Sequence, residues 1–161
     1  MYAKRDIYAW KEEARTEFSQ TASIKIKCKR NDIWMHVIYR SPNSSKQNDE
    51  NLYKWLNEMR GNYIIVGDFN FPDIRWATGS AGSKGKKFYE IITDRLMEQH
   101  VEEETHSKGN ILDLILSNKE DLVSDVRMEG KVGGSAGGLK LTEEHHKRLN
   151  TFTALTLDAC L

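Results

Sequence analysis

The fold of this chain is decided by one stretch, Ile64-Ile65-Val66-Gly67-Asp68-Phe69-Asn70-Phe71-Pro72-Asp73. Its beginning, with Tyr63, is continuously apolar and rich in β-branched residues, which predicts a strand covered on both faces. Polar residues follow at once, at the end of a strand where active sites are favoured. In an extended chain Asp68 and Asn70 project to the same side while Phe69 turns into the core. The stretch therefore predicts a buried strand that brings a carboxylate and an amide to one site.

Asp68 and Asn70 are suited to work on a phosphate ester. An ionised carboxylate only accepts hydrogen bonds and can align or deprotonate a water, whereas an amide can also donate to a phosphate oxygen. Gly67 permits a close approach of the backbone, and Pro72 stiffens the exit from the strand. The alternative is an Asx turn after a strand, which a bare Asp-x-Asn forms more often than it forms a catalytic site. These residues alone leave both interpretations open.

Three further strands are expected around this one. Apolar and basic residues alternate over residues 23–29, and residues 33–39 are aromatic and β-branched, so the two segments predict an antiparallel hairpin. The third is the run Ile111 to Leu116, which is apolar except for Asp113. A buried carboxylate costs several kcal/mol without a partner, so Asp113 requires a metal, a histidine or a hydrogen-bond network.

Two amphipathic helices are expected between these strands. The first covers residues 48–60, with Asn48 or Asp49 as its cap and Gly61 at its end. The second follows the Gly-rich residues 79–85, and its apolar face is made of Phe88, Ile91, Ile92 and Leu96. Residues 98–104 are acidic and are interpreted as a solvated helix end and turn, and the last twenty residues as a marginal helix at best. The alternation of strands and helices predicts a layered α/β domain.

Length and charge restrict the class of protein. The chain has 161 residues with 24 Lys plus Arg and 24 Asp plus Glu, so its formal net charge is zero. One domain is the expectation for this length. Neutrality excludes a globally basic protein held on nucleic acid by phosphate attraction, so any phosphate site must be local. No apolar run approaches the roughly 20 residues of a membrane span, and no membrane partner is expected.

The cell compartment is inferred from the cysteines and the first residues. Two cysteines, Cys28 and Cys160, build neither a disulfide framework nor a Cys-rich zinc site. The first twenty residues carry charges throughout and have no apolar core, so no secretory signal is expected. The prediction is an intracellular protein, nuclear or cytoplasmic.

Three tracts in this order resemble a known family. They are Val37-Ile38-Tyr39-Arg40-Ser41-Pro42, the central stretch continued through Ile74-Arg75-Trp76, and Glu104-Thr105 with Asn110-Ile111-Leu112-Asp113-Leu114-Ile115-Leu116-Ser117-Asn118. Together they are similar to the endonuclease domain of non-LTR (LINE-type) retrotransposons, within the endonuclease/exonuclease/phosphatase superfamily. The resemblance runs from about Ile24 to Gly134. It implies a DNase I-like α/β fold, a partial four-layer sandwich of two packed, mainly antiparallel β-sheets flanked by helices.

The resemblance also implies an activity and a set of residues. The activity is Mg²⁺-dependent phosphodiester hydrolysis that nicks target DNA before reverse transcription, with a reverse transcriptase domain as the expected companion in a polyprotein. Tyr39 corresponds to a tyrosine on the scissile phosphate, Asp68 to the aspartate that activates the water, and Asn70 to its neighbour that holds water and phosphate. Asp113 corresponds to the aspartate that orients a catalytic histidine. Substrate contacts are expected from Arg40, whose guanidinium can reach a phosphate, from Asn70 and from Thr105.

The chain departs from the family pattern at both ends. No residue corresponds to the metal-binding glutamate, so the metal ligands are unknown. Where the family has a final Ser-Asp-His tract, this chain has Gly133-Gly134-Ser135-Ala136-Gly137-Gly138. The expected organisation is an atypical segment over 1–22, a partial domain over 23–128 and a Gly-rich linker with a divergent tail over 129–161, truncated at both ends.

The remaining histidines and lysines have plainer interpretations. His145 and His146, beside four charged residues, predict a solvated helical face. His100 and His106 lack the spacing of a helical metal motif and are interpreted as surface residues. The lysines at positions 84, 86 and 87 either touch DNA phosphates nonspecifically or solvate a loop.

The leading hypothesis for function is a retrotransposon-type DNA endonuclease domain that is inactive or weak as this chain, because the metal ligand and the histidine are both missing. The alternative is a non-catalytic retroelement remnant with at most weak binding of nucleic acid. A phosphatase-type relative acting on a small phosphoester ranks last.

Overall fold

The computed structural model describes residues 8–106, 109–120, 122–123, 125–128 and 152–156. Its centre is a six-stranded sheet in the order β1-β2-β3-β4-β8-β7, accompanied by two small two-stranded sheets, β5-β6 and β9-β10. The strands are β1 (Ala9–Lys11), β2 (Thr21–Ile26), β3 (Ile33–Tyr39), β4 (Asn62–Asp68), β5 (Ile74–Arg75), β6 (Ser80–Ala81), β7 (Glu98–Gln99), β8 (Asp113–Ser117), β9 (Asp125–Met128) and β10 (Phe152–Thr156). The helices are α1 (Lys46–Glu58), the short 3₁₀ turn η1 (Trp76–Thr78) and α2 (Lys86–Asp94).

The sheet is mainly antiparallel. Only β3 and β4 run parallel among the described pairs, and α1 connects them. Strands β2 and β3 form the expected antiparallel hairpin, and β8 pairs with the central strand β4 on the side away from β3. The predicted α/β class is confirmed. Segment 1–22 contributes β1 and the start of β2 to this same sheet.

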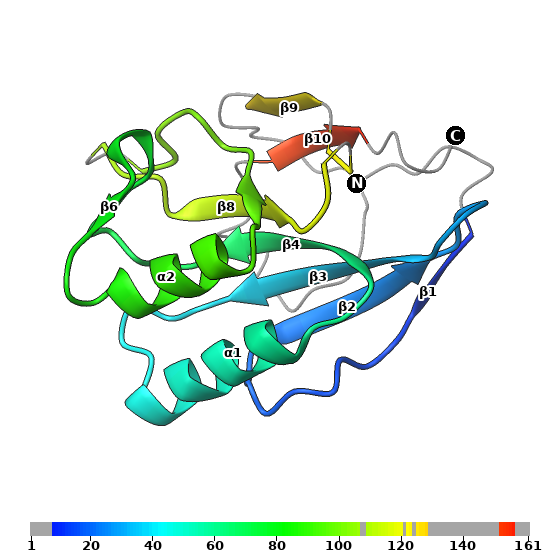
Figure 1. The fold of residues 1–161 in the computed structure, drawn as a ribbon, viewed down its shortest axis with the longest axis horizontal. Coiled ribbons are helices and arrows are strands. Elements are labelled where there is room, and N and C mark those ends of the chain that lie inside the picture. Colours follow the sequence, from blue (N-terminus) through cyan, green and yellow to red (C-terminus); the bar gives the residue numbers. More distant parts are fainter. Residues whose placement is uncertain (1–7, 107–108, 121, 124, 129–151, 157–161) are drawn as a thin grey trace, which may run out of the picture.

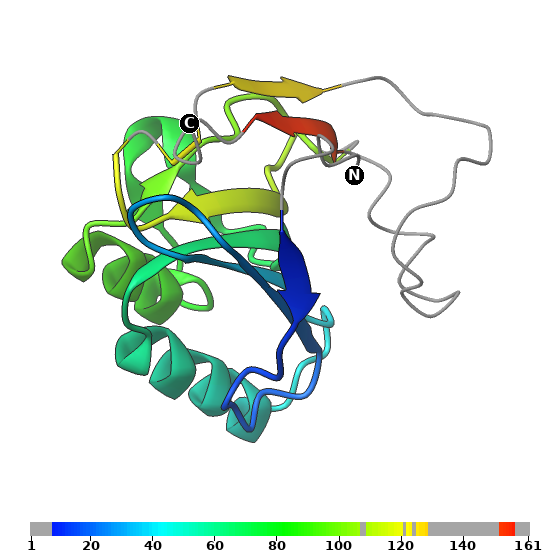
Figure 2. The same cartoon turned by 90° about the vertical axis from the view of Figure 1, so that its right-hand side faces the viewer.

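Both helices pack on one face of the sheet, as the two views show (Figures 1 and 2). The core under them includes Leu52 and Leu56 of α1, Phe88 of α2, and Ile65 and Leu114 of the sheet. A second apolar cluster, with Met35, Ile64 and Ile115, lies on the opposite face. Because successive strand residues point to opposite faces, β3, β4 and β8 supply both clusters, which explains the continuous apolar run in β4.

Helix α1 begins earlier than its apolar pattern indicates. Its cap is Ser45, whose hydroxyl accepts the backbone N–H of Asn48 at 3.2 Å, so the prediction of Asn48 or Asp49 as cap is wrong. The helix ends at Met59, and Gly61 adopts a φ of 79° in the turn that leads into β4. The cap is displaced because Asn48 and Asp49 use their side chains in contacts with other segments.

Three further expectations are corrected. Leu96 is not on the apolar face of α2, because the helix ends at Asp94 and Leu96 is 86% exposed with a φ of 52°. Residues 98–99 are not a solvated helix end but strand β7, paired with β8. Residues 152–156 are not helical but form β10, paired with β9.

No helix in the part of the chain that the structure describes is long and apolar enough to span a membrane.

Candidate active site

Three of the predicted catalytic residues form one row across neighbouring strands. Tyr39 at the end of β3 pairs in register with Asp68 at the end of β4, and Asp68 pairs with Asp113 at the start of β8. This row lies at the edge of the sheet where β3 and β4 end, on the left in Figure 1. Cβ atoms of directly opposed residues in an antiparallel pair lie about 5 Å apart. The structure therefore brings together two carboxylates and a phenol that are distant in the sequence.

The row faces away from the helices. Ile38 and Leu114 belong to the core under the helices, whereas Ile64 and Ile115 belong to the opposite cluster. Side chains alternate along a strand, so the members of the row share the face of the second cluster. Asp113 is only 7% exposed, as expected for a carboxylate inside an apolar strand.

Asn70 follows the row on a tight turn. Its backbone N–H donates to Asp68 Oδ1 at 3.1 Å, which is an Asx turn, and its φ is 50°. The expectation of an extended Asp68-Phe69-Asn70 segment is therefore wrong, although Phe69 is buried in the core as predicted. The side-chain Nδ2 of Asn70 donates to the carbonyl of Arg40 at 2.9 Å. Asp68 and Asn70 therefore form an Asx turn at the same place as the predicted site.

Gly67 allows β3 and β4 to meet beside the row. Its φ is 151°, and a Cβ added there would lie 1.9 Å from the carbonyl oxygen of Ile38. No side chain fits at that distance. The glycine is required by close approach of two backbones, as the sequence indicated.

Thr105 supports Asp113 from the preceding loop. Its Oγ1 accepts the backbone N–H of Leu112 at 2.8 Å and that of Asp113 at 3.0 Å. Through these two bonds Thr105 fixes the start of β8. The structure thus shows Thr105 in a supporting contact. Its assignment to substrate binding, which the resemblance implies, stays a prediction.

Arg40 lies on the helix side of the sheet. Its guanidinium forms a two-pronged ion pair with Asp49 of α1, with Nε to Oδ1 and Nη2 to Oδ2 both 2.8 Å. Nη1 donates to the carbonyls of Phe69 and Asn70 at 3.3 and 3.0 Å, and the group lies 4.0 Å from the centroid of the Phe71 ring. Arg40 is 7% exposed. It adjoins Tyr39 in sequence but points to the other face.

The remaining polar candidates lie apart from the row or outside the described residues. His100 Nε2 lies 2.8 Å from Ser117 Oγ, and burial lowers the pKa of His100. Lys87 pairs with Glu50 at 2.6 Å and Lys86 with Glu90 at 3.9 Å, both exposed pairs. The predictions for His145, His146 and residues 133–138 fall on residues that the structure does not describe.

The described residues contain no preformed cluster of metal ligands. Among residues 8–106, 109–120 and the short segments up to 156, no group of three or more His, Cys, Asp or Glu gathers closely enough to hold an ion. Asp68 and Asp113 supply two carboxylates, and Mg²⁺ is commonly held by one or two carboxylates while waters and substrate oxygens complete its shell.

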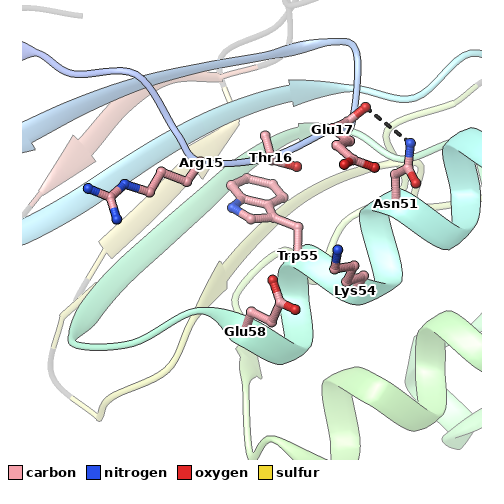
Figure 3. A pocket seen from close by; sticks show the side chains of 7 residues that line it. All are labelled: Arg15, Thr16, Glu17, Asn51, Lys54, Trp55 and Glu58. Carbon is pink, nitrogen blue, oxygen red and sulfur yellow. Dashed lines mark hydrogen bonds between the residues drawn. The ribbon is translucent and has the colours of Figure 1, made fainter.

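A cavity of about 250 Å³ lies elsewhere, between the segment before β2 and helix α1 (Figure 3). Trp55 forms part of its wall, and the other lining residues are Arg15, Thr16, Glu17, Asn51, Lys54 and Glu58. Asn51 donates to the carbonyl of Glu17 at 3.2 Å and so holds the two segments together. The cavity contains no member of the row.

Comparison with known families agrees with this geometry. The endonuclease-reverse transcriptase family matches residues 33–135, which include Tyr39, Asp68, Asn70 and Asp113. The chain belongs to the endonuclease-reverse transcriptase family. No curated protein matches the chain.

One solved structure shares the fold at low identity, and two others give weaker matches. The endonuclease domain of TRAS1, a telomere-specific non-LTR retrotransposon, superposes with a TM-score of 0.58 at 12% identity, over 77% of this chain and 60% of that one. An endonuclease/exonuclease/phosphatase family protein from Leptotrichia buccalis C-1013-b gives 0.46 at 19% identity, over 78% and 54%. The 3′ phosphatase NExo from Neisseria, bound to product DNA hairpin, gives 0.46 at 12%, over 78% and 63%. The chain thus spans about 60% of the TRAS1 domain.

Asp49 is the residue of this region whose role the sequence did not indicate. It was a candidate only for the helix cap, and its ion pair with Arg40 joins segments that the local pattern does not connect. A signal existed in the alternation of strand residues, because Tyr39 and Arg40 cannot face the same side of the sheet.

Proposed function

We propose that this endonuclease-reverse transcriptase family chain is a retrotransposon-type DNA endonuclease domain whose described residues form the water-activating and phosphate-holding part of the site. The observation that carries the proposal is the register that aligns Tyr39, Asp68 and Asp113, with Asn70 tied to Asp68 by the Asx turn. The proposed reaction is hydrolysis of a phosphodiester bond, which nicks target DNA before reverse transcription by a companion domain.

Each residue of the row, and Asn70 beside it, has a proposed task. The Asp68 carboxylate accepts a proton from the attacking water and orients it. Asn70 holds the phosphate, because an amide nitrogen has two N–H groups and the Arg40 carbonyl takes one. Tyr39 donates its phenolic O–H to a phosphate oxygen. Asp113 would fix the tautomer of a histidine, the task that the resemblance gives it.

The cofactor of the reaction is proposed to be Mg²⁺, which would stabilise the charge on the phosphate. Because the described residues do not gather a set of ligands, we expect binding of Mg²⁺ by this chain to be weak. The expected consequence is that the isolated chain nicks DNA slowly or not at all.

A nicking assay tests the proposal. The chain is incubated with supercoiled plasmid and a series of Mg²⁺ concentrations, beside Asp68→Ala and, as a matched control, Glu90→Gln, which removes an exposed carboxylate on α2. Any nicking is expected to be slow, to survive in Glu90→Gln and to vanish in Asp68→Ala. Nicking that persists in Asp68→Ala contradicts the assignment of Asp68, and rapid nicking by the unchanged chain contradicts the expected weakness.

A non-catalytic retroelement remnant is the second candidate, and it is favoured by the lack of a ligand set among the described residues. The two candidates differ in what the row does to DNA. Titration of a labelled DNA duplex, followed by anisotropy, should show affinity that drops in Asn70→Ala if the row holds phosphate. Affinity that is unchanged in Asn70→Ala, together with no nicking, supports the remnant.

A further inference from the structure

Arg40 joins three segments that meet behind the row. Its backbone N–H donates to the carbonyl of Asp68 at 2.8 Å, and its own carbonyl accepts from Asn70 Nδ2 at 2.9 Å. Its side chain reaches the carbonyls of Phe69 and Asn70 and the carboxylate of Asp49 at the start of α1. Every residue of the turn from Asp68 to Asn70 therefore has a hydrogen bond to Arg40.

We propose that Arg40 is a positioning residue, which with Asp49 as its counter-ion holds the Asp68–Asn70 turn in its working conformation. The inference rests on the proposed function of the row. It assigns to Arg40 a task in place of direct contact with the DNA phosphate.

The turn needs such support because of its backbone. Asn70 has a φ of 50°, a left-handed conformation that asparagine adopts more readily than most residues but at some cost in free energy. The Asx bond from Asn70 N–H to Asp68 Oδ1 is local. The two carbonyl contacts from Arg40 Nη1 add to the other long-range bonds of the turn, which run from the Phe69 N–H to the Leu112 carbonyl and from Asn70 Nδ2 to the Arg40 carbonyl.

The chemistry of the contact requires arginine. A guanidinium has about five N–H donors in a fixed planar fork, which serves a carboxylate with two donors and still reaches both carbonyls. A lysine ammonium in the same place keeps the charge but cannot make this set of bonds. The face of the guanidinium also lies on the Phe71 ring, which excludes water from the group.

Burial and direction of the Arg40 side chain favour a positioning role over direct contact with phosphate. The side chain of Arg40 is 8% exposed and that of Asp49 is 17% exposed. Its donors are used by Asp49, Phe69 and Asn70, on the helix side of the sheet. Reaching a phosphate held by Tyr39 would require breaking the ion pair and crossing the plane of the sheet.

Amide hydrogen exchange tests the proposal without any need for activity. The variants are Arg40→Lys and Asp49→Asn. The control is Lys87→Gln, because Lys87 of α2 forms an exposed ion pair with Glu50, the neighbour of Asp49 on α1. In both test variants we expect exchange at Asn70 and Phe69 to rise at least tenfold while the Ile65 amide in the centre of β4 changes less than twofold. Equal acceleration at all three amides, or no acceleration, would overturn the proposal.

Binding and cleavage of DNA separate positioning from phosphate contact. The salt dependence of affinity for a labelled duplex loses about 0.9 in its logarithmic slope for each phosphate contact removed. We expect Arg40→Gln to leave this slope unchanged and, where nicking is measurable, to lower kcat at least tenfold with KM within twofold. A slope reduced by about one would overturn the proposal.

The exchange result also distinguishes this inference from the proposed function. If the unchanged chain neither binds nor nicks DNA, the proposed function fails, and exchange still decides whether Arg40 holds the turn. If Arg40→Lys does not fold, Asp49→Asn provides the same test, because Asp49 lies on α1 and not in the sheet.

Discussion

Neighbouring residues at the ends of β3 and β4 have different roles because successive side chains of a strand point to opposite faces of the sheet. Tyr39 stands in the row, and Arg40 points to the helix face and binds Asp49. Asp68 stands in the same row, and Gly67 before it has no side chain because the carbonyl of Ile38 occupies the space. A one-residue shift of register in β3 or β4 would exchange the catalytic candidates with the structural residues.

The contact at Gly67 leads to a prediction for stability. Gly67→Ala introduces a methyl group that clashes with the Ile38 carbonyl, because the added Cβ would lie 1.9 Å from that oxygen. We expect it to lower the free energy of unfolding by about 4 kcal/mol or more, measured by urea denaturation. Gly61→Ala is the control, because Gly61 also has a positive φ but nothing within 4 Å of the added Cβ. That variant should lose about 1 kcal/mol, and equal losses in the two would contradict the explanation.

The sequence predicted the turn chemistry of these residues better than their conformation. Asp68 and Asn70 could be chosen because polar residues directly follow a buried strand. The left-handed φ of Asn70 could not be predicted from the sequence, because it depends on contacts with Arg40, which is distant in the chain. The same applies to Asp49, whose ion pair depends on the path of α1 across the sheet.

Elements with a strong local pattern were predicted, and those that depend on distant pairing were not. Strand β4 and helix α1 have apolar patterns long enough to be recognised from sequence. Strand β7 has only two residues, and its conformation depends on pairing with Leu116 and Ser117 of β8. The end of α2 was placed too late because Leu96 continues the helical spacing although the chain has already left the helix.

The N-terminal cap of helix α1 leads to a second prediction for stability. Ser45→Ala removes the hydroxyl that accepts the Asn48 N–H, so we expect a loss of about 1 kcal/mol in the free energy of unfolding. Ser45→Asp retains an acceptor at the same place and should remain close to the unchanged protein. Thermal and urea unfolding measure both variants. A loss in Ser45→Asp as large as in Ser45→Ala would show that the cap is not the reason.

Acid should destabilise the whole domain through a buried histidine. His36 is 5% exposed, lies 2.7 Å from Ser23 Oγ through Nδ1, and stacks on Trp34. Burial lowers its pKa from 6.5 to about 4. Above pH 6.5 the imidazole is neutral in both states, and below it only the unfolded chain takes up the proton. Stability is therefore lost as the pH falls from 6.5 towards 4.

Between pH 7 and pH 5 the expected loss from His36 is about 2 kcal/mol. The lowered pKa of His100 acts in the same direction. The measurement is urea unfolding at several pH values in this interval. His36→Phe keeps a stacking ring without a titrating group, so its stability should depend less on pH whatever its absolute stability. An unchanged dependence on pH in that variant would contradict the assignment.

The row is formed by residues of three strands, and this has a consequence for the order in which the site is completed during synthesis. A ribosome delivers the chain from the N-terminus, and a domain generally folds as a unit. Strands β3 and β4, which carry Tyr39 and Asp68, are therefore synthesised before β8. Asp113 arrives only with β8, which inserts beside β4. If the row cuts DNA as proposed, the nascent chain is harmless to nucleic acid until its sheet is nearly finished.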